Sequence, residues 1–569
     1  MTAFALSPIA ARANVYATDI KVNGSLASVN AQVASPVSIT YRLNQAATAG
    51  VTVNILQGNA IVAAINGSAK MGLNAVNWTP LIAGTYSVSI TAGAAGFPVW
   101  TQISVDTNAG MPAYYPLGID VNKNSHSPYY GRVIMGCAIH NGSDPIVTAA
   151  AQMTGLYKMN ADGTPADEGW YGDAGYAADD AGDPPVAGQM PDSFGSDPGI
   201  IRIGDDDRIY WCDNSYLGAI IACDMEAGTN QIVINEEGYA NNPDYSDLNE
   251  GIQQFDVTGA STGNGALWLC NVDSPNWGIW MYHLRAGRAD PKDTVGTQAV
   301  FAGAGSDLSQ GSSGGCMIDA NLDIFVSQNC SSNSPVVRTM QYPNWSGGTL
   351  PPEAGGFNYA DGQVTGQVNW GTGISCNAFC GVEDTVINSR INPTMVALPM
   401  TRDPGGSNTA FGIRVLNTSD GSVVRATNGA VIQTLTNIDA ANQYTCAAWD
   451  NVGNLYGAST TRHLWRVWSP PGPNLATTTA AAQVIVPTAF AVTSVTAIPV
   501  AFGCMAVTLT FTTVGNFNLA PSAFTLAGSA TVNGVYTPTP GALIIGGGGV
   551  YQATALVCAG SQFFKIEQN

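Results

Sequence analysis

One short pattern recurs along this chain, and it limits the possible folds more than any other feature. An acidic turn leads into a short apolar and aromatic run, which ends in small polar residues. Consecutive copies are about 55 to 75 residues apart. A unit of this length cannot bury both faces of its own sheet, so the units must stack on one another. Six copies can be aligned: "RVIMGCA" from Arg132, "RIYWCDN" from Arg208, "ALWLCNV" from Ala266, "DIFVSQN" from Asp323, "DTVINSR" from Asp384 and "NLYGAST" from Asn454.

Further strands flank these phrases. "GIIRIGDDD" and "CAAWDNVGN" place a strand before the acidic turn, and "LGAIIACDMEAG" and "WGIWMYHLRAG" add a hairpin after it. Each unit therefore supplies about four short antiparallel strands, which is one blade of a propeller. We expect residues 108–487 to form a β-propeller of about six blades, with seven as the alternative.

The last copy of the pattern resembles the "D-x-x-G-N-L-Y-V" corner of NHL-type bacterial β-propellers. Asp450, Gly453, Asn454, Leu455 and Tyr456 match it, and the other copies are degenerate. The resemblance implies the propeller fold and carries no functional residue with it.

Residues 18–107 alternate in short β runs, such as "SITYRL", "VTVNIL" and "GTYSVSITA". Several such strands in 90 residues predict a β-sandwich. The region resembles the immunoglobulin-like module of flagellar hook-capping proteins, which implies a spacer or assembly piece. The matching residues are Val51, Val53, Gly72, Asn74, Trp78, Gly84, Thr85 and Tyr86.

The two ends of the chain have their own patterns. Residues 488–569 predict a small C-terminal β domain, which resembles the C-terminal modules of secreted bacterial repeat proteins at "FFKI" (Phe563 to Ile566). In those proteins the module commonly lies on the cell-surface side. Residues 1–17 are apolar and contain "ARA" and "VYA", like signal-cleavage sites, but lack a positive leading segment. A signal remnant and an exposed arm both remain open.

Composition supports an all-β class. Charged residues make up only 11% of the chain and apolar residues 45%, with 65 Gly and 31 Pro. The net charge of −20, without a basic stripe, argues against nucleic-acid binding. No apolar run reaches the roughly 18 residues that span a bilayer.

The stretch from Asp162 to Asp207 contains twelve carboxylates opposed only by Arg202. Oxygen ligands on flexible turns suit Ca²⁺, although the spacing does not match an EF-hand loop. A solvated acidic insertion and catalytic carboxylates are the alternatives. The candidate calcium ligands are Asp173, Asp179, Asp180, Asp183, Asp205, Asp206 and Asp207.

These patterns predict a secreted, extracellular or cell-surface protein that is structural or binding rather than catalytic. We expect it to assemble with itself into a layer or filament. Cell-surface glycans or proteins are further candidate partners, because exposed tryptophans can stack on sugars. The alternative function is a propeller hydrolase or lactonase with a metal in its central channel, so enzymatic activity remains open.

Overall fold

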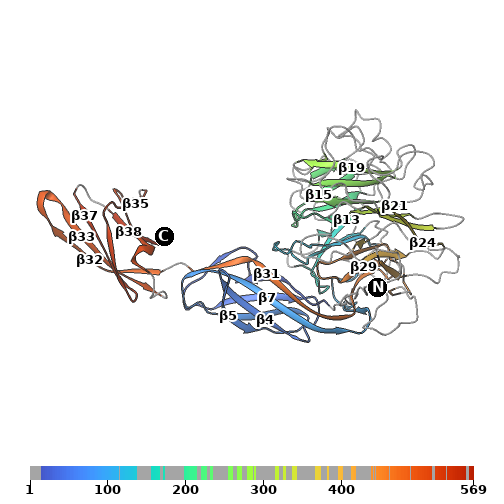
Figure 1. The fold of residues 1–569 in the computed structure, drawn as a ribbon, viewed down its shortest axis with the longest axis horizontal. Coiled ribbons are helices and arrows are strands. Elements are labelled where there is room, and N and C mark those ends of the chain that lie inside the picture. Colours follow the sequence, from blue (N-terminus) through green and yellow to red (C-terminus); the bar gives the residue numbers. More distant parts are fainter. Residues whose placement is uncertain are drawn as a thin grey trace, which may run out of the picture.

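The computed structural model describes residues 14–113, 116–137 and 155–166, most of 444–568 and, between 171 and 442, the strands with some of the turns. These residues form strands, turns and two 3-10 helices, η6 (Ala501–Gly503) and η7 (Pro521–Ala523). The expected all-β class is confirmed. Figure 1 shows three regions in a row, with β32–β38 at one end, β4, β5, β7 and β31 in the middle, and β9–β30 at the other end. No helix of the described part is long and apolar enough to cross a membrane.

The middle region consists of two sheets that share one core, and we call it the N-terminal sandwich. Its strands alternate as the sequence predicts: Ile39, Tyr41 and Leu43 are all buried. One sheet has the order β1-β3-β6, with β1 (Ala17–Val22), β3 (Val37–Leu43) and β6 (Gly72–Trp78). The other has the order β2-β31-β7-β4-β5, with β2 (Val29–Asn30), β31 (Gly472–Val486), β7 (Gly84–Phe97), β4 (Gly50–Gln57) and β5 (Ala60–Asn66).

The position of β31 differs from the boundary expected at residue 487. This strand follows the repeat region in sequence, but it pairs antiparallel with β7 and parallel with β2. Ala480, Ala482, Val484 and Val486 belong to the core of the N-terminal sandwich. The repeat region is thus inserted between two adjacent strands of one sheet. The sequence could not show this, because β31 has an ordinary strand pattern and its partner is far away in the chain.

Residues 1–17, for which a signal remnant and an exposed arm were the alternatives, pack into the fold where they are described. Asn14, Val15 and Tyr16 are buried, and β1 begins at Ala17. The Asn14 amide donates to Ser469 Oγ at 2.9 Å, and the Val15 amide donates to Asn474 Oδ1 at 3.1 Å. Residues 14–17 therefore join the first strand to the end of the chain's repeat region, while residues 1–13 lie outside the described part.

Six small antiparallel sheets follow one another between the two parts of the sandwich, and we number them one to six. Sheet one contains β9 (Pro116–Val121), β10 (Val133–Cys137), β11 (Gly155–Met159) and β12 (Tyr171–Gly172). Sheet two contains β13 (Pro198–Ile203), β14 (Ile209–Asp213), β15 (Ala219–Cys223) and β16 (Gln231–Ile234). Sheet three contains β17 (Gln254–Thr258), β18 (Ala266–Asn271), β19 (Gly278–Arg285) and β20 (Arg288–Ala289).

The remaining three sheets follow the same order. Sheet four contains β21 (Gly314–Ile318), β22 (Ile324–Gln328), β23 (Val336–Gln341) and β24 (Gly366–Thr372). Sheet five contains β25 (Gly381–Val382), β26 (Met395–Met400) and β27 (Gly412–Asn417). Sheet six contains β28 (Cys446–Trp449), β29 (Leu455–Ser459), β30 (Leu464–Ser469) and, from much earlier in the chain, β8 (Thr101–Gln102).

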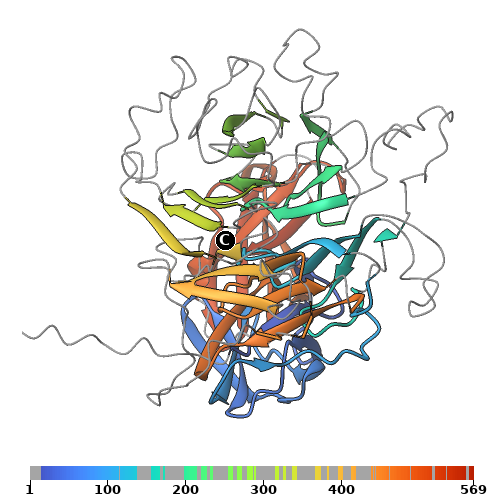
Figure 2. The ribbon, with the colours of Figure 1, turned by 90° about the vertical axis from the view of Figure 1, so that its right-hand side faces the viewer.

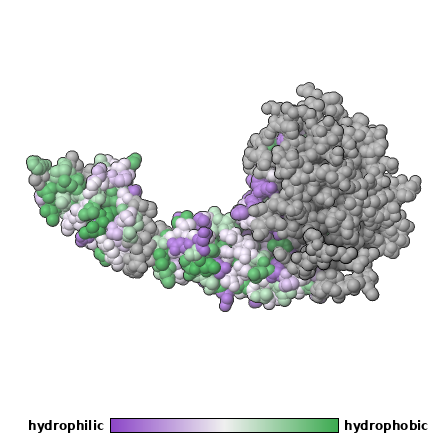
Figure 3. Space-filling view, in the orientation of Figure 1, coloured by the Kyte–Doolittle hydropathy of each residue, from purple (hydrophilic) through white to green (hydrophobic). Residues whose placement is uncertain are grey.

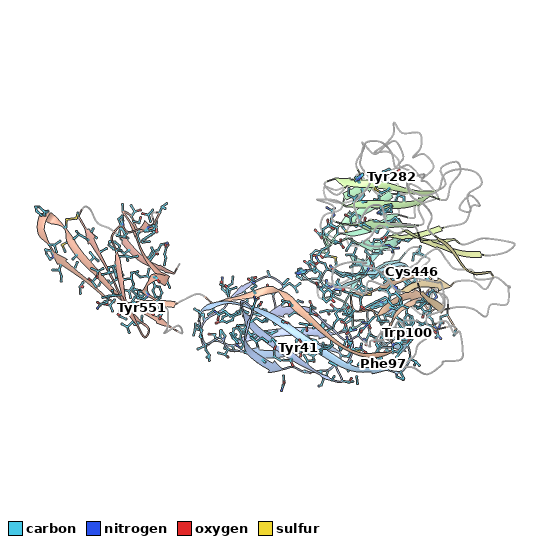
Figure 4. All side chains as sticks on the ribbon, in the orientation of Figure 1. Tyr41, Phe97, Trp100, Tyr282, Cys446 and Tyr551 are labelled. Carbon is cyan, nitrogen blue, oxygen red and sulfur yellow. A yellow bond between two sulfur atoms is a disulfide. The ribbon has the colours of Figure 1, made fainter. Side chains whose placement is uncertain are left out.

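The first strands of these sheets contact one another in the order β25, β28, β9, β13, β17, β21. Figure 2 shows the sheets following each other around a common centre, from cyan through green and yellow to orange. One core cluster holds residues of sheets one and six, such as Met135 and Tyr456. Phe97 and Trp100, labelled in Figure 4, connect the sandwich to this part of the molecule, and Trp100 lies 5.9 Å from Trp449 between ring centroids.

The recurring phrases occupy equivalent places in this arrangement. Five of the six lie on the second strand of a sheet: β10, β14, β18, β22 and β29. Cys212, Cys270 and Ser327 are therefore on equivalent strands, as their alignment predicts. The "DTVINSR" copy lies outside the described residues, and the second strand of sheet five is instead β26.

The C-terminal module comprises residues 489–568. A disulfide between Cys504 and Cys558 links the start of β33 to the end of β37. Two sheets enclose a core that includes Phe511, Phe524 and Tyr551. One has the order β32-β33-β37-β36, with β32 (Ala489–Pro499), β33 (Met505–Val514), β37 (Val550–Val557) and β36 (Leu543–Gly547). The other has the order β35-β34-β38, with β35 (Thr537–Pro538), β34 (Phe524–Ser529) and β38 (Phe563–Gln568).

Candidate functional site

The predicted calcium ligands are only partly described. Asp205, Asp206 and Asp207 lie in the turn that joins β13 to β14, where the Gly204 amide donates to Arg208 O at 2.9 Å. The described residues contain no group of three or more His, Cys, Asp or Glu side chains placed to hold a metal ion. The other four predicted ligands lie outside the described residues: Asp173, Asp179, Asp180 and Asp183.

The Asp207 carboxylate has a structural role that explains its place in the turn. Its Oδ1 accepts hydrogen bonds from Asn122 Nδ2 at 3.0 Å and from Asn124 Nδ2 at 3.1 Å. The Asn124 side chain also donates to the Asp205 carbonyl at 3.3 Å. These contacts fasten the hairpin of sheet two to that of sheet one. The acidic turn is thus a joint between neighbouring sheets.

A second polar group lies on the first strands of sheets one to three, which contact one another in sequence order. Asp120, Arg202 and Asp256 are each at most 5% exposed. Arg202 Nε lies 3.3 Å from Asp256 Oδ1, and Lys123 Nζ lies 3.3 Å from Asp120 Oδ1. Each of the two acids thus has a basic partner, which offsets the cost of burying its charge.

The same two carboxylates also accept backbone hydrogen bonds. Asp120 Oδ2 accepts from the Ile203 amide of the next sheet at 2.8 Å, and Asp256 Oδ1 accepts from the Val257 amide at 2.9 Å. Arg202 donates to the carbonyl of Ile201. These groups hold the first strands in place, and the charges within the group are balanced.

In the "DNVGN" turn, hydrogen bonds and backbone conformation explain why the motif contains Asp, Gly and Asn. Asp450 Oδ1 accepts the amides of Val452 and Asn454, and Asn454 Nδ2 donates to Asp450 Oδ2 at 2.6 Å. Gly453 has a φ of 90°, a conformation that favours glycine. The carboxylate thereby completes a tight turn before β29.

This turn also binds the segment formed by residues 14–16. Tyr456 Oη lies 3.2 Å from Asp450 Oδ2 and 3.3 Å from Tyr16 Oη. Asn454 Nδ2 donates to the Asn14 carbonyl at 2.9 Å. Burial raises the pKa of Asp450 to about 6 despite its hydrogen bonds, and it raises the pKa of Tyr16 and Tyr456 well above the usual value. These hydrogen bonds therefore form a buried structural contact between the turn and residues 14–16.

Ion pairs fasten the sandwich to sheet one. Arg42 of β3 lies 3.4 Å from Asp19 and 3.2 Å from Asp162, measured between nitrogen and carboxylate oxygen. It also donates to Thr164 Oγ1. Both acidic side chains are at most 5% exposed, so this contact is protected from solvent screening.

The tryptophans considered for sugar stacking are mostly part of the packing between sheets. The side chains of Trp277 and Trp280 lie outside the described residues. Trp211, Trp268, Trp465 and Trp468 are all at most 3% exposed. They offer no face to a glycan.

Charge is divided very unevenly along the chain. Residues 108–471 contain 37 of the 40 acidic and 15 of the 20 basic residues, a net charge of −22. Residues 1–107 carry +2, and residues 472–569 carry no net charge. The C-terminal module has just two charged residues, Lys565 and Glu567, which pair at 2.6 Å. This module therefore lacks the repulsion that keeps like molecules apart.

The same module exposes many large apolar side chains, and Figure 3 shows them as green patches at that end of the molecule. Phe502 in η6 is fully exposed. Exposed apolar groups without surrounding charges mark contact surfaces. They are Val492, Val495, Ile498, Val500, Phe502, Val532, Val535, Leu543, Ile545, Val550, Leu556 and Phe563.

The edge strand β32 is the most unusual part of this surface. It has 11 residues, and every side chain described in it, from Val492 to Pro499, is exposed. It pairs on one side with β33, and no described strand pairs with its other side. We call this strand and its open side the β32 edge. Long, apolar and unpaired edges readily accept another strand.

One face of β32 continues the core of the module without being covered. Val495 pairs with Leu509 and Val492 pairs with Phe511, and both partners are buried in the core. Residues opposite each other in a sheet lie on the same face. The described core cluster includes residues of the other three strands of this sheet but none of β32. The facing sheet of three strands therefore leaves β32 uncovered.

Comparison with known proteins gives little further information. No family model matches the sequence. No curated protein matches it either. Among solved structures, the chain is similar to a structural genomics protein of unknown function from Bacteroides thetaiotaomicron. The two share 10% identity with a TM-score of 0.33, over 82% of this chain and 99% of that one.

The β32 edge could not be predicted from the sequence pattern of residues 488–569. A partial signal was present, because residues 488–564 contain no charged residue. The sequence does not reveal which strand is left uncovered, since that depends on how many strands the facing sheet has.

Proposed function

We propose that this protein is an extracellular, non-catalytic structural protein whose copies associate through their β modules. The observation that carries the proposal is the division of charge and apolar surface. The acidic sheets bury balanced ion pairs, whereas the C-terminal module is uncharged, exposes apolar side chains and ends its sheet in an open strand. Such a module is stabilised by contact with another chain.

We further propose that sheets one to six are the blades of a six-bladed propeller and that the N-terminal sandwich is immunoglobulin-like. The contacts between β9 and β28 and the shared core of sheets one and six support a ring of blades. The pairing of β8 with β30 supports it too, because a strand from before the first blade completes the last one.

The extracellular location is supported by the C-terminal module. Disulfides persist in oxidising compartments, and the Cys504–Cys558 bond spans 54 residues of a module with a small core. The sheets in turn contain buried thiols. Burial raises the pKa of Cys223 and of Cys446 to about 12, so both stay protonated and unreactive.

The competing function, a hydrolase or lactonase with a channel metal, needs carboxylates that converge with a surplus of negative charge. Asp120 and Asp256 instead face Lys123 and Arg202. Because these acids already have basic partners and backbone donors, the described first strands favour a rigid support over a metal centre.

Light scattering on the full chain over a range of concentrations tests the proposal. We expect the mass to rise above that of one chain, and to stay raised when salt is added. Salt screens the repulsion between the net charges of −20 while leaving the apolar contact intact. A mass of one chain at every concentration and salt level would refute self-association.

A further inference from the structure

We propose that the contact between copies is made by the β32 edge of one chain with the β32 edge of a second copy, in an antiparallel and symmetric pairing. The inference rests on the proposed self-association and specifies its surface, its partner and its symmetry. It also identifies which of the exposed apolar strands takes part.

The β32 edge has a shape that fits a second copy of itself. Antiparallel pairing about a twofold axis joins the two four-stranded sheets into one sheet of eight strands. Val492, Val495 and Ala497 of each chain then lie together on one face, beside the buried Leu509, Phe511 and the partly buried Val507 opposite them. The two uncovered strips become neighbours at the centre of the joined sheet.

The distribution of charge favours pairing of β32 with the same strand of a second copy. The C-terminal module lies at the opposite end of the molecule from sheets one to six, which carry the negative charge (Figure 1). Pairing through β32 brings two uncharged modules together and keeps the two acidic regions far apart. Screening acts over about 8 Å at physiological salt, so the distant charges oppose this pairing very little.

Charge also disfavours docking of β32 against the acidic sheets of a second copy. Such a contact would offer no charge complementarity, because residues 488–564 contain no charged residue. The other exposed strand of the C-terminal sheet, β36, has five residues, and it includes Gly546 with a φ of 141°. It is a shorter and less regular template than β32.

Three matched lysine substitutions in the full chain test the surface. Val495 on β32 is 62% exposed, Leu543 on β36 is 61% exposed, and Ile61 on β5 of the sandwich is 60% exposed. Each substitution places a charge on an edge strand without filling a core position. We expect Val495→Lys to weaken association at least about 100-fold, because the symmetric contact contains the substitution twice. Leu543→Lys and Ile61→Lys should leave it unchanged.

A pair of opposite charges tests the symmetry. Val495→Lys and Val495→Glu should each fail to associate alone, and mixing the two variants should restore dimers. Residue 495 is one residue from the middle of β32, so its two copies lie close together across the twofold axis and then carry opposite charges. Masses come from sedimentation velocity, and unchanged circular dichroism confirms folding.

The outcomes separate this inference from the proposed function. If the natural chain associates but Val495→Lys associates equally well, the β32 edge is not the contact, and Leu543→Lys or Ile61→Lys will identify the edge that is. If Val495→Lys dissociates and the mixture of variants stays monomeric, the strand binds a different surface. If the natural chain is monomeric throughout, the proposed function fails as well.

Discussion

Sheets one to six and the C-terminal module are built from the same kind of antiparallel strands, yet they differ in the number and placement of their charged residues. Residues 108–471, which include these sheets, carry a net charge of −22, and ion pairs such as Arg202 with Asp256 are buried between neighbouring sheets. The C-terminal module carries no net charge and leaves every described side chain of β32 exposed. The comparison teaches that strand pattern decides the fold, whereas the distribution of charge decides whether a surface faces water or another chain.

The largest effect is expected from removing β31, which connects the two kinds of region. A chain that ends at residue 470 loses Ala480, Ala482, Val484 and Val486 from the core of the sandwich. We expect the sandwich to lose its cooperative unfolding, a cost above about 5 kcal/mol, comparable to the stability of a whole domain. A chain that ends at residue 487 keeps β31 and should unfold like the full chain, measured by denaturant titration. Equal unfolding of the two truncated chains would show that β31 does not complete the sandwich.

This interlocked topology marks the limit of what the sequence could predict. Local patterns identified the second strand of five sheets, because an acidic turn followed by alternating apolar residues is a local signal. They also identified the Asp450–Asn454 turn, whose side chains bond to their own backbone. The pairing of β31 with β7, the addition of β8 to β30 and the role of Asn14 to Tyr16 depend on contacts between distant parts of the chain. No short pattern encodes those contacts.

A smaller effect is expected from the disulfide, which distinguishes the C-terminal module from the sheets. Cys504→Ser should destabilise the module by about 4 kcal/mol, the value expected for closing a loop of this length in the unfolded chain. The measurement is the denaturant midpoint of the module with and without reductant. Reductant should lower the midpoint of the natural chain and leave that of Cys504→Ser unchanged. If reductant acts equally on both, the bond is not the source of the stability.

The smallest of the three effects concerns pH and the buried Asp450. Burial raises its pKa from 3.8 to about 6, so the folded state holds a proton that the unfolded state has lost between these values. Its contribution to stability is complete below pH 3.8 and falls as the pH rises through 6, by up to about 3 kcal/mol in total. The difference in unfolding free energy between the natural chain and Asp450→Asn should therefore change across this range. A difference independent of pH between 3.8 and 6 would contradict the buried, desolvated carboxylate.

The central claim is that the uncharged C-terminal module makes the contact between copies. Sedimentation equilibrium on the full chain and on the chain that ends at residue 487 tests it most directly, because the shorter chain retains β31 and every sheet before it. The account predicts dimers for the full chain and single chains for the shorter one at the same concentration. Equal association of the two chains would contradict it.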